Sequence, residues 1–536
     1  MDLLAHSVAW LLVFVLLSTL RKKSQRSSNN NGQLPPEVPG AWPIIGHMHL
    51  LLADQIPLQR ILAAIADKLG PIFTLRLGMH RTVVITDRKA LRDCFTTYDK
   101  ALAGRPESSA GEILGYNNAG FGFVSYGPYW RRIRKIVLSE LLSCRRLEKF
   151  GDARAAEVEA SIGELYSTVT GEGRRNRRNN SPVMINVGNW IEKLALNLMV
   201  KMIAGKRYRT TDDWEDDDDE AKRSRKAIVE FLTSSGQSVV SDVIPIPLLR
   251  WIDIGGSIKS MKRIAAEMDA IISGWIDEHA ERISISESDR DFIDVLLSSV
   301  TDDLLEYGHA KDTIIKATIA TIIVAGSDSP SLTLTWALSL LINNKDALER
   351  AREEIDTIVG VERWVQESDI KNLIYLQAII KETLRLYPPA PLAVPHAATE
   401  DCAAVAGYRI HKGTRVILNL WKLHRDPEVW AGAEEFRPDR FLPGGGASEV
   451  DFLGQHFEYI PFGSGRRICP GIGFATQVCH LVLGRLIQGF EFGAPPCAAV
   501  DMAEGVSFSL PRAKPLEVLV APRLASALYE QKRIAS

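Results

Sequence analysis

The chain has 536 residues, with 64 Lys and Arg against 66 Asp and Glu and a formal net charge of −2. This balance excludes a basic nucleic-acid-binding protein and an acidic tail protein. The six cysteines are spread out without a Cys-x-x-Cys pair, so neither a zinc site nor a disulfide framework is expected, and a reducing compartment fits better. No long linker rich in Pro, Gly and Ser divides the chain after its first forty residues. One large, mainly helical unit is therefore an alternative to several domains.

Residues 1–20 are predicted to form an N-terminal membrane anchor. Leu3–Leu20 is almost entirely apolar, and four cations follow it between Arg21 and Arg26. A cleaved signal peptide would carry its positive charge before the apolar run instead. A helix of about 18 residues just crosses a bilayer core of roughly 30 Å. The cations behind it predict that the main body lies in the cytoplasm, on a single-pass anchor retained in the endoplasmic reticulum.

The next twenty residues, 21–40, are predicted to connect the anchor to the main body. Ser24–Gln33 is polar, and Leu34–Gly40 contains three prolines, which favour an extended path. Residues 41–536 are then expected to form one unit. Within it, the β-branched runs Ile72–Leu77 and Thr82–Thr86 predict an antiparallel hairpin.

Two helices of the main body carry polar residues that point to function. From Pro128 the pattern turns helical and places Trp130 and Arg134 four residues apart, on one face. Lys311–Asn344 is a long apolar stretch interrupted by charged residues such as Asp328, so it predicts a core helix rather than a second membrane span. A buried acid is costly unless it has a partner or a task.

Phe462–Gly471 surrounds one cysteine with glycines, arginines and a proline, and an apolar helical stretch follows. Glycine lets the backbone approach so that N–H groups can donate to a sulfur, and a helix N-terminus favours a thiolate. These features predict that Cys469 binds a metal, most simply a haem iron.

The same segment fits the haem-binding loop of the cytochrome P-450 family, Phe-x-x-Gly-x-Arg-x-Cys-x-Gly, at every fixed position, and the resemblance extends from about Leu34 to the C-terminus. It implies a mainly α fold with a small β region and a heme b cofactor whose iron is bound by Cys469. Phe462 and Gly465 belong to the implied cofactor-binding loop. The resemblance also implies that four residues contact the haem propionates: Trp130, Arg134, His396 and Arg467.

Ala325-Gly326-Ser327-Asp328-Ser329 is similar to the oxygen-binding motif of the family. The resemblance implies that Asp328 and Ser329 relay protons to bound oxygen, a role that an acid beside an alcohol can perform. The chain departs from the family pattern by having Ser329 in place of threonine and Pro330 after it. Serine is less restricted at χ1, and proline removes an N–H that would donate to Gly326, so a kinked or widened helix is expected here. An equally open alternative is that Pro330 merely fixes a distortion already present in the family.

Further resemblances concern the structural core and the pocket. Glu-x-x-Arg at Glu382 and Arg385, with Arg440 in a later loop, resembles the buried charge cluster of the family. Tyr387–His396 is expected to leave the preceding helix as an extended strand. The residues implied as pocket walls are Phe121, Phe123, Ala325, Ala393, Val394 and Phe508.

The function implied is that of a monooxygenase of plant specialised metabolism, because Ser241–Gly256 and Thr333–Leu341 resemble plant P-450 family 82. No Gly-x-Gly-x-x-Gly fingerprint follows a strand, so electrons must come from a partner, and the resemblance implies NADPH–P-450 reductase, with cytochrome b5 as a second donor. The apolar pocket implies a lipophilic alkaloid, terpenoid or phenolic substrate. Two alternatives stay open: a haem-thiolate enzyme that rearranges its substrate or forms a ring without net oxygen insertion, and a non-catalytic haem sensor.

Overall fold

The computed structural model describes residues 33–51, 56–171, 182–208, 219–236, 239–244, 253, 255–281, 290–495 and 499–530. The predicted anchor and most of the polar tether lie outside these residues. Among the helices that are described, none combines the length and the apolar composition needed to cross a membrane. The proline-rich segment runs in an extended path beside the first strand, where the Val38 N–H donates to the Thr74 carbonyl at 2.9 Å.

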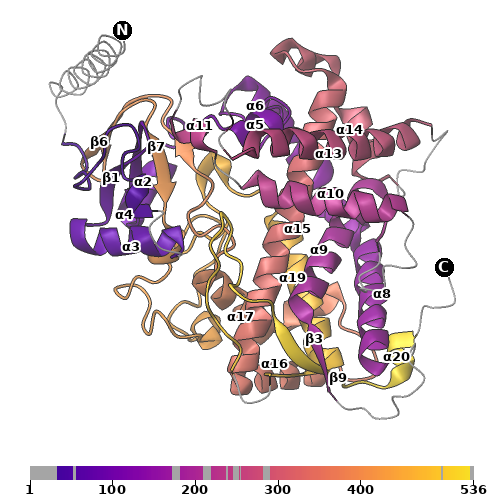
Figure 1. Ribbon diagram of the computed structural model, residues 1–536. Helices are drawn as coiled ribbons and strands as arrows, with labels where there is room; N and C mark the ends of the chain where they lie inside the picture. The colour runs from indigo at the N-terminus through magenta and orange to yellow at the C-terminus, as the bar shows by residue number, and fades with distance from the viewer. Residues whose placement is uncertain are drawn as a thin grey trace, which may run out of the picture.

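Helices dominate the described chain (Figure 1). The first half contains α2 (Met48–Leu51), α3 (Leu58–Leu69), α4 (Arg88–Phe95), α5 (Ser109–Ile113), α6 (Pro128–Ile136), α7 (Cys144–Lys149), α8 (Gly151–Thr170), α9 (Val187–Ala204), α10 (Asp219–Ser235), α11 (Val240–Val243) and α13 (Ser257–Ala280). The second half contains α14 (Phe292–Ser299), α15 (Lys311–Asn343), α16 (Lys345–Ile358), α17 (Ile374–Leu386), α18 (Leu420–Leu423), α19 (Ile472–Gly489) and α20 (Ser526–Glu530). Shorter helical turns are η2 (Val137–Leu141), η4 (Asp302–Tyr307), η5 (Glu367–Asn372), η6 (Pro438–Phe441) and η7 (Gly465–Arg467).

The strands form three small sheets. The largest has the order β1-β2-β7-β4, the second β3-β9-β8, and the third β5-β6. Their bounds are β1 (Ile72–Leu77), β2 (His80–Ile85), β3 (Val183–Asn186), β4 (His396–Ala397), β5 (Cys402–Val405), β6 (Tyr408–Ile410), β7 (Arg415–Leu418), β8 (Phe490–Gly493) and β9 (Glu517–Pro522). The antiparallel β1–β2 hairpin confirms the sequence prediction. The strand predicted over Tyr387–His396 is wrong for most of its length, because only His396 pairs in a sheet, with Val416, and prolines remove ladder donors before it.

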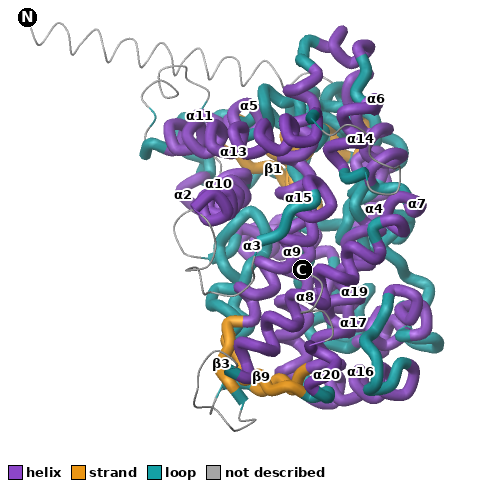
Figure 2. The backbone as a smooth tube through the Cα atoms, turned by 90° about the vertical axis from the view of Figure 1, so that its right-hand side faces the viewer, coloured by secondary structure: helices purple, strands orange, loops and turns teal. Residues whose placement is uncertain are grey.

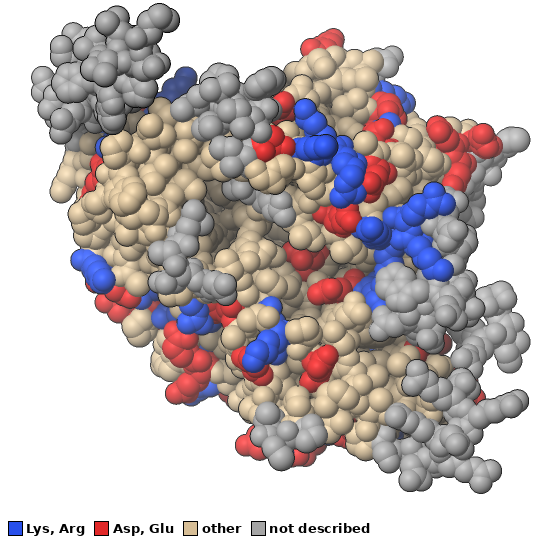
Figure 3. All heavy atoms as spheres, viewed as in Figure 1, with Lys and Arg blue, Asp and Glu red and all other residues tan. Residues whose placement is uncertain are grey.

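The helix α15 is the axis of the helical part and packs against α9, α17 and α19 (Figures 1 and 2). Most of its side chains are buried on all sides, as the sequence predicts for a core helix, and Trp336 is fully buried. Close approach to α9 requires a small residue at Gly326, where an added Cβ would lie 2.5 Å from the Met199 sulfur. The N-terminal sheet lies to one side of this helical part, and Figure 3 shows a hollow in the face between them.

Candidate active site

The cysteine loop precedes α19 and is held in a tight reverse turn. The Cys469 N–H donates to the Phe462 carbonyl at 2.9 Å, and the Gly471 N–H donates to the Cys469 Sγ at 3.3 Å. Gly463 and Gly465 have φ angles of 73° and 62°, which favour glycine. A Cβ at Gly465 would lie 2.4 Å from Asp99 Oδ1. The turn thus exposes one sulfur to a backbone donor, as a thiolate ligand requires.

The surroundings of Cys469 shift the pKa of its thiol in opposite directions. Burial raises the pKa of its thiol, whereas the Gly471 N–H and the Arg134 guanidinium lower it. Without a metal the sulfur therefore retains its proton at neutral pH, and metal binding would release it. Phe462, whose ring meets that of Phe452 edge-on, lies at the start of the same loop.

The guanidinium groups of Arg105, Arg134 and Arg467 gather beside this loop, and the described residues offer them no acidic partner. Arg134 of α6 donates to the Ile468 carbonyl, and its charge lies 5.1 Å from the centre of the Trp130 ring. Arg467 donates to the carbonyls of Ala103 at 2.9 Å, Phe121 at 3.3 Å and Val124. Burial, followed by the charges of Arg105 and Arg134, lowers the pKa of Arg467 to about 8. Within the described part of the chain no carboxylate offsets these charges. Buried charges normally have partners, so this cluster fits a ligand that carries anionic groups, such as the propionates of haem.

Arg105 is the member of this group that sequence reasoning missed. It lies in the loop before α5, and its Nη1 donates to the carbonyls of Val394 at 3.1 Å and Pro395 at 2.9 Å. Burial and the charge of Arg134 lower its pKa to about 10. No local pattern marks an arginine in a loop as functional, and only its distant contacts reveal it.

Trp130 and His396, both expected to contact propionates, lie at the cluster. The Trp130 Nε1–H donates to the Phe121 carbonyl at 3.1 Å. The His396 Nδ1–H donates to the Leu102 carbonyl at 2.7 Å, so Nε2 is the nitrogen left to contact a propionate. Burial, with the charges of Arg105 and Arg467, lowers the pKa of His396 to about 3, and the ring is neutral at physiological pH until an anion binds.

The motif residues of α15 lie in an unbroken α-helix that continues through Pro330. The predicted widening is wrong, because no π-helical turn interrupts α15, whereas the predicted kink stays a prediction. The Ser329 Oγ–H donates to the Ala325 carbonyl at 2.7 Å, and the Ser331 and Thr333 hydroxyls likewise donate to carbonyls one turn earlier. These bonds satisfy the hydroxyl groups inside the helix, whereas the Gly326 carbonyl receives no N–H from Pro330.

Asp328 lies next to these hydroxyl groups and is largely enclosed. Burial raises the pKa of its carboxyl, and a hydrogen bond from Ser509 acts in the opposite direction. Asp328 in turn helps raise the pKa of Glu192 on α9, after the larger effect of burial. An acid whose pKa is raised towards neutrality is suited to take up and release protons.

The expected pocket walls differ in exposure. Ala325, Val394 and Phe508 are exposed, Phe123 is half-buried, and Phe121 is buried. Ala393 has a φ of 52°, which is rare for a residue other than glycine and marks local strain. Gly120 packs on α15, where an added Cβ would lie 2.6 Å from the Thr321 Oγ1. The loop carrying Phe121 therefore lies against α15 about one helical turn before Ala325.

The charge cluster expected in the core is brought together as predicted. Glu382 accepts from Arg385 at 2.8 and 2.9 Å and from the Arg440 Nε at 3.0 Å. It also accepts the Arg437 N–H at 2.9 Å, and Glu382 and Arg385 are fully buried. Every oxygen of the carboxylate is satisfied, which is the condition under which a buried ion pair is tolerated.

His424 beside this cluster predicts a pH dependence of stability. Its Nε2 accepts the Ile460 N–H at 3.1 Å, which requires a neutral ring. Burial, then the charges of Arg385 and Arg425, lowers its pKa to about 3 from 6.5. The unfolded chain thus binds a proton that the folded chain excludes between pH 6.5 and 3, and stability falls as pH drops through this window.

We expect His424→Gln to remove this contribution, because a glutamine oxygen accepts the same N–H and does not titrate. The slope of unfolding free energy against pH should decrease by up to about 1.4 kcal/mol per pH unit below pH 6.5. Urea unfolding of the haem-bound protein at several pH values measures this slope. Lys89→Gln, at an exposed position of α4, should leave the slope unchanged; an unchanged slope in His424→Gln contradicts the prediction.

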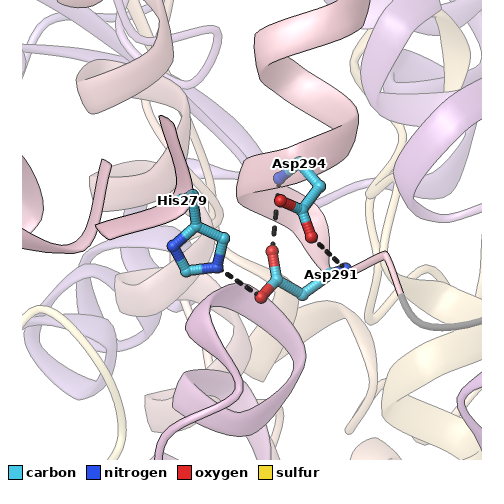
Figure 4. Close-up of side chains that lie close together, drawn as sticks. All are labelled: His279, Asp291 and Asp294. Carbon is cyan, nitrogen blue, oxygen red and sulfur yellow. Dashed lines mark hydrogen bonds and ion pairs between the residues drawn. The ribbon is translucent and has the colours of Figure 1, made fainter. Parts of the chain in front are cut away.

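A second group of ligand-type side chains, His279, Asp291 and Asp294, is explained without a metal (Figure 4). Asp291 begins α14 and accepts the N–H groups of Ile293 and Asp294, while Asp294 accepts the Asp291 N–H at 3.1 Å. The His279 Nε2 lies 2.6 Å from the Asp291 Oδ2, and its Nδ1 donates to the Trp275 carbonyl. The cluster caps α14 and joins it to the end of α13.

Comparisons with known proteins agree with this geometry. A family model described as "Cytochrome P450" matches residues 35–518. Vinorine hydroxylase of Rauvolfia serpentina is 46% identical over 537 residues, covering 99% of this chain and 100% of the relative. Nicotine N-demethylase CYP82E4 of Nicotiana tabacum is 45% identical over 529 residues, covering 97% and 98%. Xanthotoxin 5-hydroxylase CYP82C2 of Arabidopsis thaliana is 44% identical over 524 residues, covering 97% and 98%.

A solved structure shares the fold. A zebra fish cytochrome P-450 with progesterone has a TM-score of 0.70 and 24% identity, covering 87% of this chain and 99% of that chain. The family binds haem through a cysteine thiolate, and a cysteine that receives a backbone N–H beside arginines without described acidic partners fits that cofactor. The chain belongs to the cytochrome P-450 family of monooxygenases, and its relatives include members of plant family 82.

Proposed function

We propose that this protein inserts one atom of O2 into a lipophilic small molecule of plant specialised metabolism, using electrons from NADPH–P-450 reductase. The observation that carries the proposal is the pairing of Cys469, which receives the Gly471 N–H, with a cluster of three guanidinium groups that no described acid neutralises. Cys469 would bind the iron, and Arg105, Arg134, Arg467 and His396 would hold the propionates. Bound there, haem would supply the iron at which O2 is reduced with electrons from the reductase, so that one oxygen atom enters the product and the other leaves as water.

The residues of α15 perform the proton chemistry in this proposal. Asp328, whose pKa burial raises, would accept a proton from water and pass it on towards the Ser329 hydroxyl. The Ser329 hydroxyl is oriented by its bond to the Ala325 carbonyl, so its oxygen lone pairs can accept a hydrogen bond from water or from Asp328. Exposed Ala325 leaves space for substrate beside these groups.

The relatives narrow the class of substrate. They are named for vinorine, nicotine and xanthotoxin, and a flavonoid-6-hydroxylase of Mentha piperita is 44% identical. We extend this range to an alkaloid, terpenoid or phenolic substrate here. The apolar run Leu3–Leu20 and the cations after it support a single-pass anchor in the endoplasmic reticulum membrane, with reductase and cytochrome b5 as partners in that membrane.

Three measurements on the full chain test the proposal. We expect a thiolate-type absorption band in the reduced CO complex, NADPH-dependent O2 consumption with reductase, and label from isotopic O2 in the product of a plant-metabolite panel. A CO band without any turnover would favour the haem sensor. Conversion of a hydroperoxide without reductase or O2 would favour the rearrangement enzyme.

The two departures from the family pattern, Ser329 and Pro330, should affect how much of the NADPH consumed yields product rather than peroxide. We expect Ser329→Thr combined with Pro330→Thr to lower peroxide formed per NADPH roughly twofold, because a threonine χ1 is more restricted by about 0.5 kcal/mol. The ratio of peroxide to NADPH and the product profile measure the effect. If neither changes, these two residues do not control proton delivery or reaction type.

A further inference from the structure

A carboxylate from a distant part of the chain, that of Asp99, contacts the cysteine loop. Asp99 lies in the turns that follow α4, and its Oδ1 accepts the Arg466 N–H at 3.0 Å. Its Oδ2 lies 2.9 Å from the Arg466 Nε. A Cβ added at Gly465 would lie 2.4 Å from Oδ1 and 3.0 Å from Cγ of the same side chain. The acid therefore rests directly against the backbone of the loop, and glycine at position 465 leaves room for it.

The N–H that Asp99 accepts belongs to η7, the turn that leads to Cys469. The first N–H groups of a helical turn have no acceptor within that turn. In η7 the Ile468 N–H donates to the Gly465 carbonyl at 3.2 Å. The Arg466 N–H donates instead to Asp99, 367 positions away in the chain. Because a hydrogen bond to a carboxylate is roughly twice as strong as one between neutral groups, Asp99 fixes the backbone shortly before the cysteine.

This backbone bond should matter more than the ion pair beside it. The Asp99 side chain is 16% exposed, whereas that of Arg466 is 45% exposed. A half-exposed guanidinium is screened by water and salt, so the charge pair contributes little. Arg466 also has another partner, since its Nη1 donates to the Tyr126 hydroxyl at 3.2 Å. The bond from the Arg466 N–H, in contrast, ends on a carboxylate that is largely shielded from water.

The residues that follow Asp99 bind two other groups of the site. The Ala103 carbonyl accepts the Arg467 Nε–H at 2.9 Å. The Leu102 carbonyl accepts the His396 Nδ1–H at 2.7 Å. One short segment therefore bonds to the cysteine loop through Asp99 and to two side chains expected to hold propionates. A shift of the loop against this segment would change the distance between the sulfur and those side chains.

We propose that Asp99 is a positioning residue for the monooxygenase reaction: by accepting the Arg466 N–H, it holds the cysteine loop in the conformation in which Cys469 binds iron as a thiolate. It acts through the backbone of the loop. The Gly471 N–H, which donates to the Cys469 Sγ at 3.3 Å, favours the thiolate only while the loop keeps this conformation. A loosened loop would lose that donor, and the buried sulfur would take up a proton from solvent. The inference rests on the proposed function in placing a haem at Cys469.

The test follows the thiolate in the CO complex of the haem-bound full chain, reduced with dithionite so that neither reductase nor substrate is needed. In this complex a thiolate ligand and a neutral thiol ligand give different absorption bands. The rate at which the first band converts to the second is measured in urea, at a fixed interval below the unfolding midpoint of each variant. Asp99→Ala should accelerate the conversion roughly tenfold or more, which is the effect typical of groups that support a metal ligand.

Two further variants separate the backbone bond from the charge pair. Asp99→Asn keeps an oxygen that can accept the Arg466 N–H, and Arg466→Ala keeps the N–H itself. Each should accelerate the conversion by less than about threefold, because each removes only the screened charge pair. If either converts as fast as Asp99→Ala, the charge pair and not the backbone bond holds the loop, and the proposal is overturned.

Asp369→Ala is the matched control for general damage. Asp369 lies in η5, accepts the Gln366 N–H at 2.9 Å and lies 2.7 Å from the Arg363 Nη1, with a side chain that is 14% exposed. Its loss removes the same kinds of bond, so this variant should lower the unfolding midpoint and leave the conversion rate unchanged. A conversion in Asp99→Ala as slow as that of the parent protein, or an equal acceleration in Asp369→Ala, would contradict a positioning role.

Amide exchange separates this inference from the proposed haem site. Exchange of the Arg466 N–H needs no haem and should accelerate roughly tenfold in Asp99→Ala, because opening of the turn exposes this N–H, and stay unchanged in Asp369→Ala. Absence of the thiolate-type band in the parent protein would contradict the proposed haem site instead. The exchange at Arg466 would then still decide whether Asp99 holds the turn, and an unchanged rate in Asp99→Ala would show that it does not.

Discussion

Cys469→Ser is expected to abolish NADPH-dependent oxidation and the thiolate-type band of the reduced CO complex. A serine hydroxyl keeps its proton at neutral pH and is a harder, weaker ligand than a thiolate. The Gly471 N–H, 3.3 Å from the sulfur, would then face a group that carries no charge. Loss of a group that only supports a metal ligand costs about 10–100-fold, so loss of the ligand itself should reduce turnover by more than about 100-fold.

Haem content, the CO spectrum and reductase-supported turnover measure this effect. Cys144→Ser is the matched control, because Cys144 is an exposed cysteine at the start of α7. It should retain both the spectrum and the activity. Retention of the thiolate band in Cys469→Ser would show that another cysteine binds the iron.

Glu382→Gln is expected to lower the free energy of unfolding by about 3–5 kcal/mol. The substitution removes the charge that offsets two buried guanidinium groups, and it replaces an acceptor with an amide that points a donor towards Arg385 or Arg440. Both arginines would be left in the interior with too few acceptors. The loop before η6 that carries Arg437 should loosen as well, since the Arg437 N–H bonds to the same carboxylate.

Urea unfolding, followed by tryptophan fluorescence and by loss of the CO band, measures this stability. Glu353→Gln changes the same residue type on the exposed face of α16 and should cost less than about 0.5 kcal/mol. A loss below about 1 kcal/mol for Glu382→Gln would mean that the arginines find other acceptors. The carbonyls of His424, Ala433 and Glu435, which Arg385 already contacts, are the candidates for that role.

The core helix and the hairpin could be predicted because they follow from local patterns. Continuous apolar character around Trp336 predicts a buried helix, and β-branched alternation about Gly78 predicts the β1–β2 pair. The strand expected before His396 was wrong because extended backbone without N–H donors cannot enter a sheet ladder. At Pro330 the helix α15 continues, because packing against α9, α17 and α19 overrides the local preference of a single proline.

By itself, the sequence determined the chemistry: a cysteine among glycines, an acid and hydroxyl within an apolar helix, and paired charges that later meet at Glu382. Each can be recognised as a short motif in the sequence, without knowledge of contacts between distant segments. Only the tertiary structure decided which charges share a space, because Arg105 meets Arg134 and Arg467 across loops, and nothing near Arg105 in the chain marks it. The same holds for the positive φ angles of Tyr116, Asn117 and Asn118, since backbone strain is imposed by packing between distant segments rather than by local preference.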